Sequence, residues 1–220
     1  MTDLELPATL TAPVFEATGI LFGKMGAVSR DMKPFIKEIT PNGNPIFDAK
    51  QVLERLDVAG KMLRDARFPL VFAADERFKN ALSCFYLATG IDTRGGRLLP
   101  GAFTNPHPGI HVDADILLVS DPNNGIPTKL NEPFTGDRRA MAEASSVGIP
   151  IIAICNSNAS LEGVDLAIPA NNLGAKAIAT AFYVLAFSYL RGKEGAVVPP
   201  LLKFETPQED LNTEKEDDEI

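Results

Sequence analysis

The chain has 220 residues, of which 45% are hydrophobic and 23% charged, a balance that suits a globular protein with one substantial core. No apolar run approaches the ~20 residues of a membrane span, and Met1–Glu5 lack the basic and apolar regions of a signal peptide. We therefore expect a cytoplasmic protein with no membrane partner, although the net charge of −8 at first argues against nucleic acid.

Before residue 70 the sequence predicts a helix, a hairpin and a second helix. The opening helix should cover about 8–17. Extended runs at 35–40 and 45–48 flank Pro41-Asn42-Gly43-Asn44, and Asn-Gly is the strongest short-range hairpin signal. Apolar residues at helical spacing then predict a helix over 49–67.

From residue 70 onward, apolar strands alternate with helical patterns. Strands are predicted at 70–74, 91–93, 116–120, 150–155 and 166–168, and helices at 76–89, 137–147 and 174–191. This alternation predicts an α/β domain, a three-layer αβα sandwich with a mostly parallel sheet. Polar residues follow three strands, at 75–77, 121–122 and 156–158. Binding loops gather at such carboxyl ends of strands in open sheets.

The acidic residues are concentrated at one end of the sequence. Residues 205–220, which we call the acidic tail, hold eight acidic residues and one Lys, whereas residues 1–204 hold 20 basic and 21 acidic residues. Between Lys24 and Arg97, 13 basic residues oppose nine acidic ones. We therefore predict one domain over 1–204, a disordered tail over 205–220, and a basic face despite the net charge.

Enzymatic and cofactor sites find little support in the sequence. Residues 19–26 are glycine-rich, but they lack the spacing and the preceding strand of a phosphate-binding loop. His107 and His111 lie in a Pro-rich loop, where a helical pair of metal ligands is not expected. Asp75 and Asp121 at strand ends could act as acids or bases, but carboxylates there more often cap helices and turns. We expect no catalytic residue, no metal site and no cofactor.

Both cysteines lie in apolar stretches with no His or Cys at ligand spacing. This pattern disfavours a disulfide or a zinc site. We expect Cys84 and Cys155 to be buried thiols in a reducing compartment.

The basic residues of the first quarter of the chain are candidates for contacts with phosphates. Lys24, Arg30 and Lys33 lie in a predicted loop, from which long side chains can reach RNA. Taken singly, each is explained equally well as a solvated surface charge. Phe22 and Phe35 beside them could stack on bases, although core packing is the safer interpretation.

A series of motifs runs along residues 8–192. The motifs are Ala17-Thr18-Gly19-Ile20-Leu21-Phe22-Gly23, Arg30-Asp31-Met32-Lys33-Pro34-Phe35-Ile36, Arg97-Leu98-Leu99-Pro100-Gly101-Ala102-Phe103-Thr104-Asn105-Pro106, the strand that ends in Asp121-Pro122, Gly148-Ile149-Pro150, and Val164-Asp165-Leu166-Ala167-Ile168-Pro169-Ala170-Asn171-Asn172. In this order they resemble small-subunit ribosomal protein two, in its archaeal and eukaryotic-type form. The last motif, which precedes the final helix, is the most specific.

The resemblance implies a flavodoxin-like αβα sandwich that helps to build the small ribosomal subunit and is not an enzyme. It also implies binding to small-subunit ribosomal RNA and to neighbouring ribosomal proteins, with no DNA partner. By position in the family's motifs, the RNA-binding residues would be Lys24, Arg30, Lys33, Arg97, Thr104, Asn105, Asn172 and Lys176. The last two lie near the start of the final helix, and helix N-termini offer backbone N–H groups to phosphate.

The sequence departs from the family pattern in several places. Leu21 replaces a common His, and Asn156 replaces the Asp of a Cys-Asp pair. Asn123 stands where a basic residue is usual. Residues 123–136 look like an insertion before the next helix, which could bind a protein particular to this lineage.

Two other classes of function stay open on the sequence alone. A flavodoxin-like enzyme or small-molecule-binding domain would use the loops at the strand ends. A protein-interaction module would use the acidic tail. The acidic composition also fits a high-salt cytoplasm.

Overall fold

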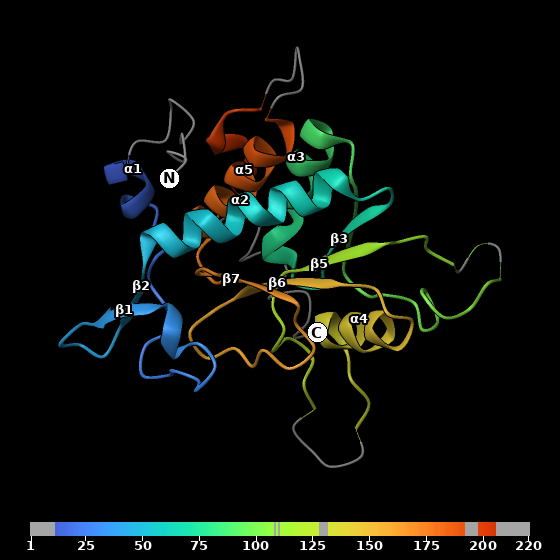
Figure 1. The fold of residues 1–220 in the computed structure, drawn as a ribbon, viewed down its shortest axis with the longest axis horizontal. Coiled ribbons are helices and arrows are strands. Elements are labelled where there is room, and N and C mark those ends of the chain that lie inside the picture. The colour runs from blue at the N-terminus through green and yellow to red at the C-terminus, as the bar shows by residue number, and fades with distance from the viewer. Residues whose placement is uncertain (1–11, 108, 110, 128–131, 192–197, 206–220) are drawn as a thin grey trace, which may run out of the picture.

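The structure is a computed structural model that describes residues 12–107, 109, 111–127, 132–191 and 198–205, without the side chains of residues 12–14. At its centre lies a sheet of five parallel strands in the order β4-β3-β5-β6-β7 (Figure 1). The strands are β3 (Pro69–Ala73), β4 (Asp92–Gly95), β5 (Ile116–Val119), β6 (Ile151–Cys155) and β7 (Leu166–Pro169). Every residue of β5, β6 and β7 is buried, as expected when helices cover both faces of a sheet.

The strand order identifies the topology of the domain. If the five strands from β3 to β7 are numbered 1 to 5 by their order in the chain, they lie side by side in the order 2-1-3-4-5. Every neighbouring pair is parallel. This is the flavodoxin-like arrangement, whose order reverses between β3 and β5. The predicted αβα sandwich with its parallel sheet is therefore confirmed.

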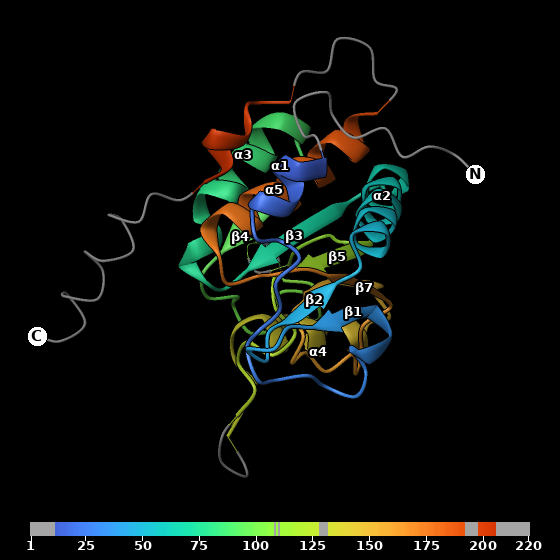
Figure 2. The same ribbon diagram turned by 90° about the vertical axis from the view of Figure 1, so that its left-hand side faces the viewer.

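Helices cover the two faces of the sheet unequally (Figures 1 and 2). Three of them, α2 (Ala49–Asp65), α3 (Lys79–Thr89) and α5 (Ala175–Leu190), lie over one face. The other face carries α4 (Gly136–Ser146). A short 3₁₀ turn, η2 (Glu76–Phe78), leads into α3, so the predicted helix over 76–89 is divided.

The helical layer is built around α5, in which 12 of the 16 residues are buried, so it lacks a wide polar face. The ring of Phe182 packs edge-on against Phe78 and Phe85, with centroid distances of 6.1 and 5.6 Å. Gly60 of α2 permits close approach to α5, because a Cβ at that position would lie 2.5 Å from Ser188 Cβ. The core therefore depends on tight contact between these helices.

Two smaller elements precede this layer in the chain. The predicted hairpin is confirmed: β1 (Ile36–Ile39) and β2 (Pro45–Phe47) are antiparallel, and Gly43 has the positive φ of +81° that such a turn needs. The opening helix, α1, spans Ala12–Ala17. Residues 8–11 of its predicted range lie outside the described residues.

The described parts of the insertion, residues 123–127 and 132–136, are joined to each other by hydrogen bonds that form a neck. Thr135 N–H donates to the Gly125 carbonyl at 3.0 Å, and Arg138 N–H donates to the Asn124 carbonyl at 2.9 Å. Gly125 has a φ of +89°, and a Cβ there would lie 1.8 Å from the Thr135 oxygen. Only glycine fits this neck, beyond which the described residues 126–127 and 132–134 run away from the sheet (Figure 1).

The last described element, η3 (Leu201–Phe204), packs against α3 and α5. Phe204 is fully buried, and its ring lies 5.9 Å from that of Tyr183. Residues 201–204 therefore pack with the helical layer. The division at 205 stays a prediction, because 206–220 lie outside the described residues.

The two cysteines differ in their surroundings. Cys155 is buried, as predicted. The prediction was wrong for Cys84, which is only partly buried and whose Sγ donates to the Lys203 carbonyl at 2.7 Å. Within the described ranges, no helix has the length and apolar character needed to span a membrane.

Candidate nucleic-acid interface

The carboxyl edge of the sheet brings together polar residues from four loops. Asp75 follows β3, Asp121 follows β5, Asn156 follows β6 and Asn172 comes shortly after β7. Hydrogen bonds join these loops to one another and to α4. The predicted convergence of these segments is confirmed.

At the point where the strand order reverses, Asp75 and Arg77 form an ion pair. Arg77 Nε donates to the Asp75 carboxylate at 2.9 Å, and Nη2 makes a further contact with it. Burial alone would raise the pKa of Asp75, but the hydrogen bonds and charge of Arg77 outweigh it and hold that pKa below its usual value. Asp75 also accepts from Arg77 N–H at 2.9 Å, so it caps a turn, the more common duty of such carboxylates.

Asp121 has a similar structural duty. It accepts from Asn123 N–H at 2.9 Å, and burial raises its pKa. The side chain of Asn123 is itself fixed, since Nδ2 donates to the Asn158 carbonyl at 2.9 Å. The start of the insertion is thereby held against the loop that follows β6.

The most deeply buried carboxylate of this edge was not predicted from the sequence: it is Asp137, in the first turn of α4. It accepts from Ala74 N–H at 2.7 Å, from Asp121 N–H at 2.8 Å and from the Ser120 hydroxyl. Burial raises the pKa of Asp137 to about 7, although these bonds act to lower it. Asp137 thus ties α4 to the ends of β3 and β5. In the sequence it looks like any acidic residue near a helix start, so no signal marked it.

Asn156 and Asn172 form a buried amide pair beneath the predicted RNA-binding loop. Asn156 Oδ1 accepts from Lys24 N–H at 2.9 Å, and Nδ2 donates to Asn172 Oδ1 at 3.0 Å. Asn172 Nδ2 donates to the Ser120 carbonyl at 3.3 Å. Because Asn172 is only 2% exposed, the predicted contact of its side chain with RNA does not fit the structure. Asn172 positions the edge instead.

Residues 23–33, which we call the basic loop, are anchored at several points. A Cβ at Gly23 would lie 2.7 Å from Ser157 Cβ, so glycine permits the close approach. Ser29 N–H donates to the Ser157 carbonyl at 2.8 Å, and Ser29 Oγ to the Ala159 carbonyl at 2.6 Å. Met32 is fully buried. The backbone of this loop is therefore held in place by the loop that follows β6.

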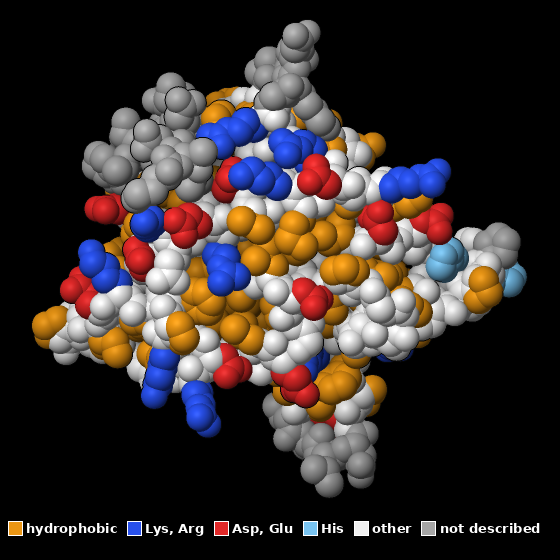
Figure 3. Space-filling model, viewed as in Figure 1, with side chains coloured by type: hydrophobic (Ala, Val, Ile, Leu, Met, Phe, Trp, Pro, Cys, Tyr) orange, Lys and Arg blue, Asp and Glu red, His pale blue; other side chains and the backbone are white. Residues whose placement is uncertain are grey.

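The three cations predicted in the basic loop are all exposed: Lys24, Arg30 and Lys33. Lys and Arg side chains project from the surface in Figure 3 at the place where this loop lies in Figure 1. A fixed backbone with exposed Lys and Arg side chains suits contacts with phosphates, because such contacts depend on the length of the side chains more than on the shape of the surface.

The segment that carries Arg97, Thr104 and Asn105 lies elsewhere, along α4. Gly101 N–H donates to the Glu143 carboxylate of α4 at 3.1 Å. Asn105 Oδ1 accepts from His107 N–H at 3.1 Å, which holds the turn. Arg97, Thr104 and Asn105 are exposed, but the structure does not bring them together with the basic loop.

The last predicted contact, Lys176, is exposed in the first turn of α5. The N-cap residue Gly174 offers no side-chain acceptor, and the first turn holds no acidic residue. The start of α5 therefore presents positive charge that the helix itself does not neutralise.

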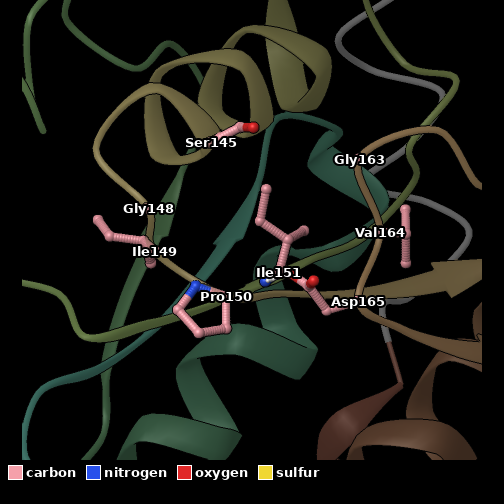
Figure 4. Close-up of a pocket in the computed structure, with 8 residues that line it drawn as sticks. All are labelled: Ser145, Gly148, Ile149, Pro150, Ile151, Gly163, Val164 and Asp165. Carbon is pink, nitrogen blue, oxygen red and sulfur yellow. Dashed lines mark hydrogen bonds between the residues drawn. The ribbon is translucent and has the colours of Figure 1, made fainter.

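Two hollows lie at the opposite, amino edge of the sheet. One, of about 420 Å³, is lined by loop backbone and the residues that Figure 4 labels, and the carboxylate of Asp165 accepts there from Ile151 N–H at 2.8 Å. The other, of about 500 Å³, includes Asp92 paired with Arg94 and Asp113 paired with His111. Ligands of open parallel sheets bind at the carboxyl edge, so neither hollow favours the alternative of a flavodoxin-like small-molecule site. No cluster of metal ligands occurs in the part of the chain that the structure describes.

Comparisons with known proteins agree on one family. The sequence model of the family described as "Ribosomal protein S2" matches residues 134–192. The chain is 36% identical over 180 residues to small ribosomal subunit protein uS2 of Korarchaeum cryptofilum, covering 80% of this chain and 75% of the relative. It is 34% identical to the protein of the same name from Thermofilum pendens over 212 residues, covering 92% of each chain. For Nanoarchaeum equitans the identity is 32% over 200 residues, covering 88% of this chain and 93% of the relative.

Proposed function

Because this chain belongs to the ribosomal protein S2 family, we propose that it is a structural constituent of the small ribosomal subunit. The similarity to proteins named small ribosomal subunit protein uS2 extends over most of both chains, and this observation carries the proposal. The protein is accordingly not an enzyme, and its place is the ribosome in the cytoplasm. All three relatives are archaeal, which fits the archaeal-type motifs.

The basic loop is the best-supported contact with ribosomal RNA. Its backbone is fixed by Asn156, Ser157 and Ala159, so its exposed cations lose little backbone freedom on binding. Lys24, Arg30 and Lys33 would bind phosphates, with little reading of bases. Such binding should weaken steeply with salt.

Further RNA contacts would come from the remaining exposed residues of the predicted set. Arg97 and Lys176 supply charge, and Thr104 and Asn105 supply hydroxyl and amide groups on the α4 side. The buried side chain of Asn172 would instead support the basic loop, through its hydrogen bond with Asn156. The RNA would then contact more than one part of the surface.

Contacts with neighbouring ribosomal proteins would use apolar side chains that are left exposed around the hairpin. Phe22, Met25 and Ile39 are 46%, 68% and 59% exposed. Large apolar side chains that are accessible on one part of a surface are typical of protein interfaces. Phe22 directly precedes the basic loop and Met25 lies within it, so a neighbouring protein would contact the chain next to the proposed RNA contacts.

The proposal is tested by sedimenting a cell lysate on a density gradient and detecting the chain in the fractions. We expect it in the small-subunit fractions at low salt and its release at high salt. Its absence from those fractions at low salt would contradict the proposal.

A further inference from the structure

The described chain ends beside the first turn of α3. Asn80 Nδ2 donates to the Glu205 carbonyl at 3.4 Å, and Cys84 Sγ donates to the Lys203 carbonyl. Asn80 precedes Cys84 along α3, whereas Glu205 follows Lys203, so the segment runs antiparallel to the helix. It therefore arrives at Glu205 heading toward the start of α3, at the carboxyl edge of the sheet.

Exposed cations lie at that edge on two adjoining helices. Lys79 opens α3 and Lys176 stands in the first turn of α5, and both are exposed. Arg77, just before α3, donates from Nη1 to the Leu173 carbonyl at 3.4 Å, which joins the two helix starts. Among the described residues, neither Lys79 nor Lys176 has a carboxylate within 4.0 Å. Glu76, exposed in the 3₁₀ turn before α3, is the acidic residue nearest to Lys79 in the sequence.

We propose that the acidic tail binds this cationic surface of Lys79 and Lys176 within its own chain and competes there with RNA phosphate. The competition rests on the proposed function, but the binding does not. Residues 206–220 hold seven acidic residues and one Lys, so the charges are complementary. Fully extended, these 15 residues would reach at most about 50 Å from Glu205.

The tether makes weak binding sufficient. A short linker gives an effective concentration on the order of 1 mM, so a site with a dissociation constant of about 0.1 mM for the free segment would be mostly occupied. The start of α5, which lacks an acidic residue and a side-chain cap, adds a favourable dipole. Both contributions are electrostatic, so about 0.5 M salt should release the tail.

Binding is tested without RNA by NMR on the full chain. One sample has the natural tail, and in the other all seven acidic residues of 206–220 are changed to Asn or Gln. Outside the tail, whose own shifts change with the substitutions, we expect amide shift differences at low salt only in the first turns of α3 and α5, and their loss at high salt. The differences should vanish when both samples also carry Lys79→Glu and Lys176→Glu. They should persist in a control pair with Lys37→Glu and Lys50→Glu, which has the same net charge.

The competition is tested by titrating the same four pairs of proteins with poly(U) RNA. Neutralising the tail should tighten binding by about tenfold in the natural and control backgrounds, and much less when Lys79 and Lys176 are reversed. Equal gains in every background would show a general charge effect and overturn the competition. Absence of poly(U) binding by every variant would count against the proposed function, while the NMR result would stand alone.

Three NMR outcomes would overturn the binding itself. They are no shift differences at low salt, differences centred on the basic loop, and differences that grow with protein concentration. The last would identify the occupant as the tail of a second copy.

Discussion

The side-chain amide of Asn156 donates to the side-chain carbonyl of Asn172 at 3.0 Å, linking the ends of β6 and β7 beneath the basic loop. The same Asn156 accepts from Lys24 N–H through its oxygen. One buried residue therefore joins the strand ends to the loop that carries the proposed RNA contacts. An Asn can do this because its side chain both donates and accepts.

We predict that Asn156→Ala lowers the free energy of unfolding by about 2–4 kcal/mol, because it leaves buried partners without hydrogen bonds. Urea unfolding followed by circular dichroism would measure the loss. Asn158→Ala is the control, since within the described chain its side chain makes no hydrogen bond, and its cost should stay below about 0.5 kcal/mol. Equal costs for the two variants would contradict the role of the amide pair.

The strands and helices were predictable because each has a local cause in the sequence. Uniformly apolar runs became the buried strands β5 and β6, and Asn42-Gly43 became the turn of the hairpin. The basic loop was also recognisable, since its cations have no apolar pattern to bury them. These features depend on residues close together in the chain.

The interior of the carboxyl edge could not be predicted in the same way. Asp137 contacts Ala74, which is 63 positions away, and Asn156 contacts Lys24, which is 132 positions away. Nothing local in the sequence distinguishes a buried Asn172 from an exposed one, so the burial of its side chain could not be predicted. The partial exposure of Cys84 likewise depends on where η3 ends its path along α3.

Reversing two charges in the basic loop should weaken incorporation into small subunits. Lys24→Glu with Lys33→Glu would remove two of the proposed phosphate contacts and add repulsion, so we expect incorporation to fall at least about tenfold. The fold should be unaffected, because both side chains are exposed. Quantitative immunoblots across a gradient would measure the fall.

A matched control for that experiment is Lys50→Glu with Arg94→Glu, which changes the net charge equally at exposed positions of α2 and β4. It should incorporate nearly as well as the natural protein. If both variants incorporate equally, the basic loop is not a specific contact.

Stability should decrease as pH rises from 5 to 8. The pKa of Asp137 is about 7 in the folded protein and near 3.9 in the unfolded chain, so between these values only the folded protein keeps the proton. This group therefore favours folding most at low pH and ceases to do so as pH rises through 7. The loss from pH 5 to 8 should be up to about 3 kcal/mol.

Urea unfolding at several pH values would measure this dependence, with Asp137→Asn as the comparison. The variant should be less stable at pH 5, because it loses an acceptor, but its stability should change less with pH. Burial raises the pKa of Asp121 too, so some dependence of the same sign should remain. An unchanged slope in Asp137→Asn would refute the assignment.

At the neck of the insertion, Gly125→Ala should be costly. The new Cβ would overlap the Thr135 carbonyl, so the neck must open and lose the hydrogen bond between Thr135 and Gly125. We expect a loss of about 3 kcal/mol or more. Gly148→Ala separates the effect of a positive φ from the effect of steric overlap. Gly148 also has a positive φ, of +78°, but no atom lies within 4 Å of the added Cβ. Gly148→Ala should therefore cost only about 1 kcal/mol. If the two variants melt at similar temperatures, the neck relieves the overlap at Gly125 and the prediction is wrong.

Removal of the acidic tail should leave the domain stable. Truncation of the side chain of Phe204, the residue just before the tail, should destabilise it. Deleting 205–220 removes no buried apolar side chain among the described residues, and electrostatic docking of a tethered segment contributes little at moderate salt. We expect the melting temperature to change by less than about 3 °C. Phe204→Ala, by contrast, opens a cavity between α3 and α5 and should cost about 3–5 kcal/mol. A large loss on deleting 205–220 at 0.5 M salt would show that the tail is packed as part of the core.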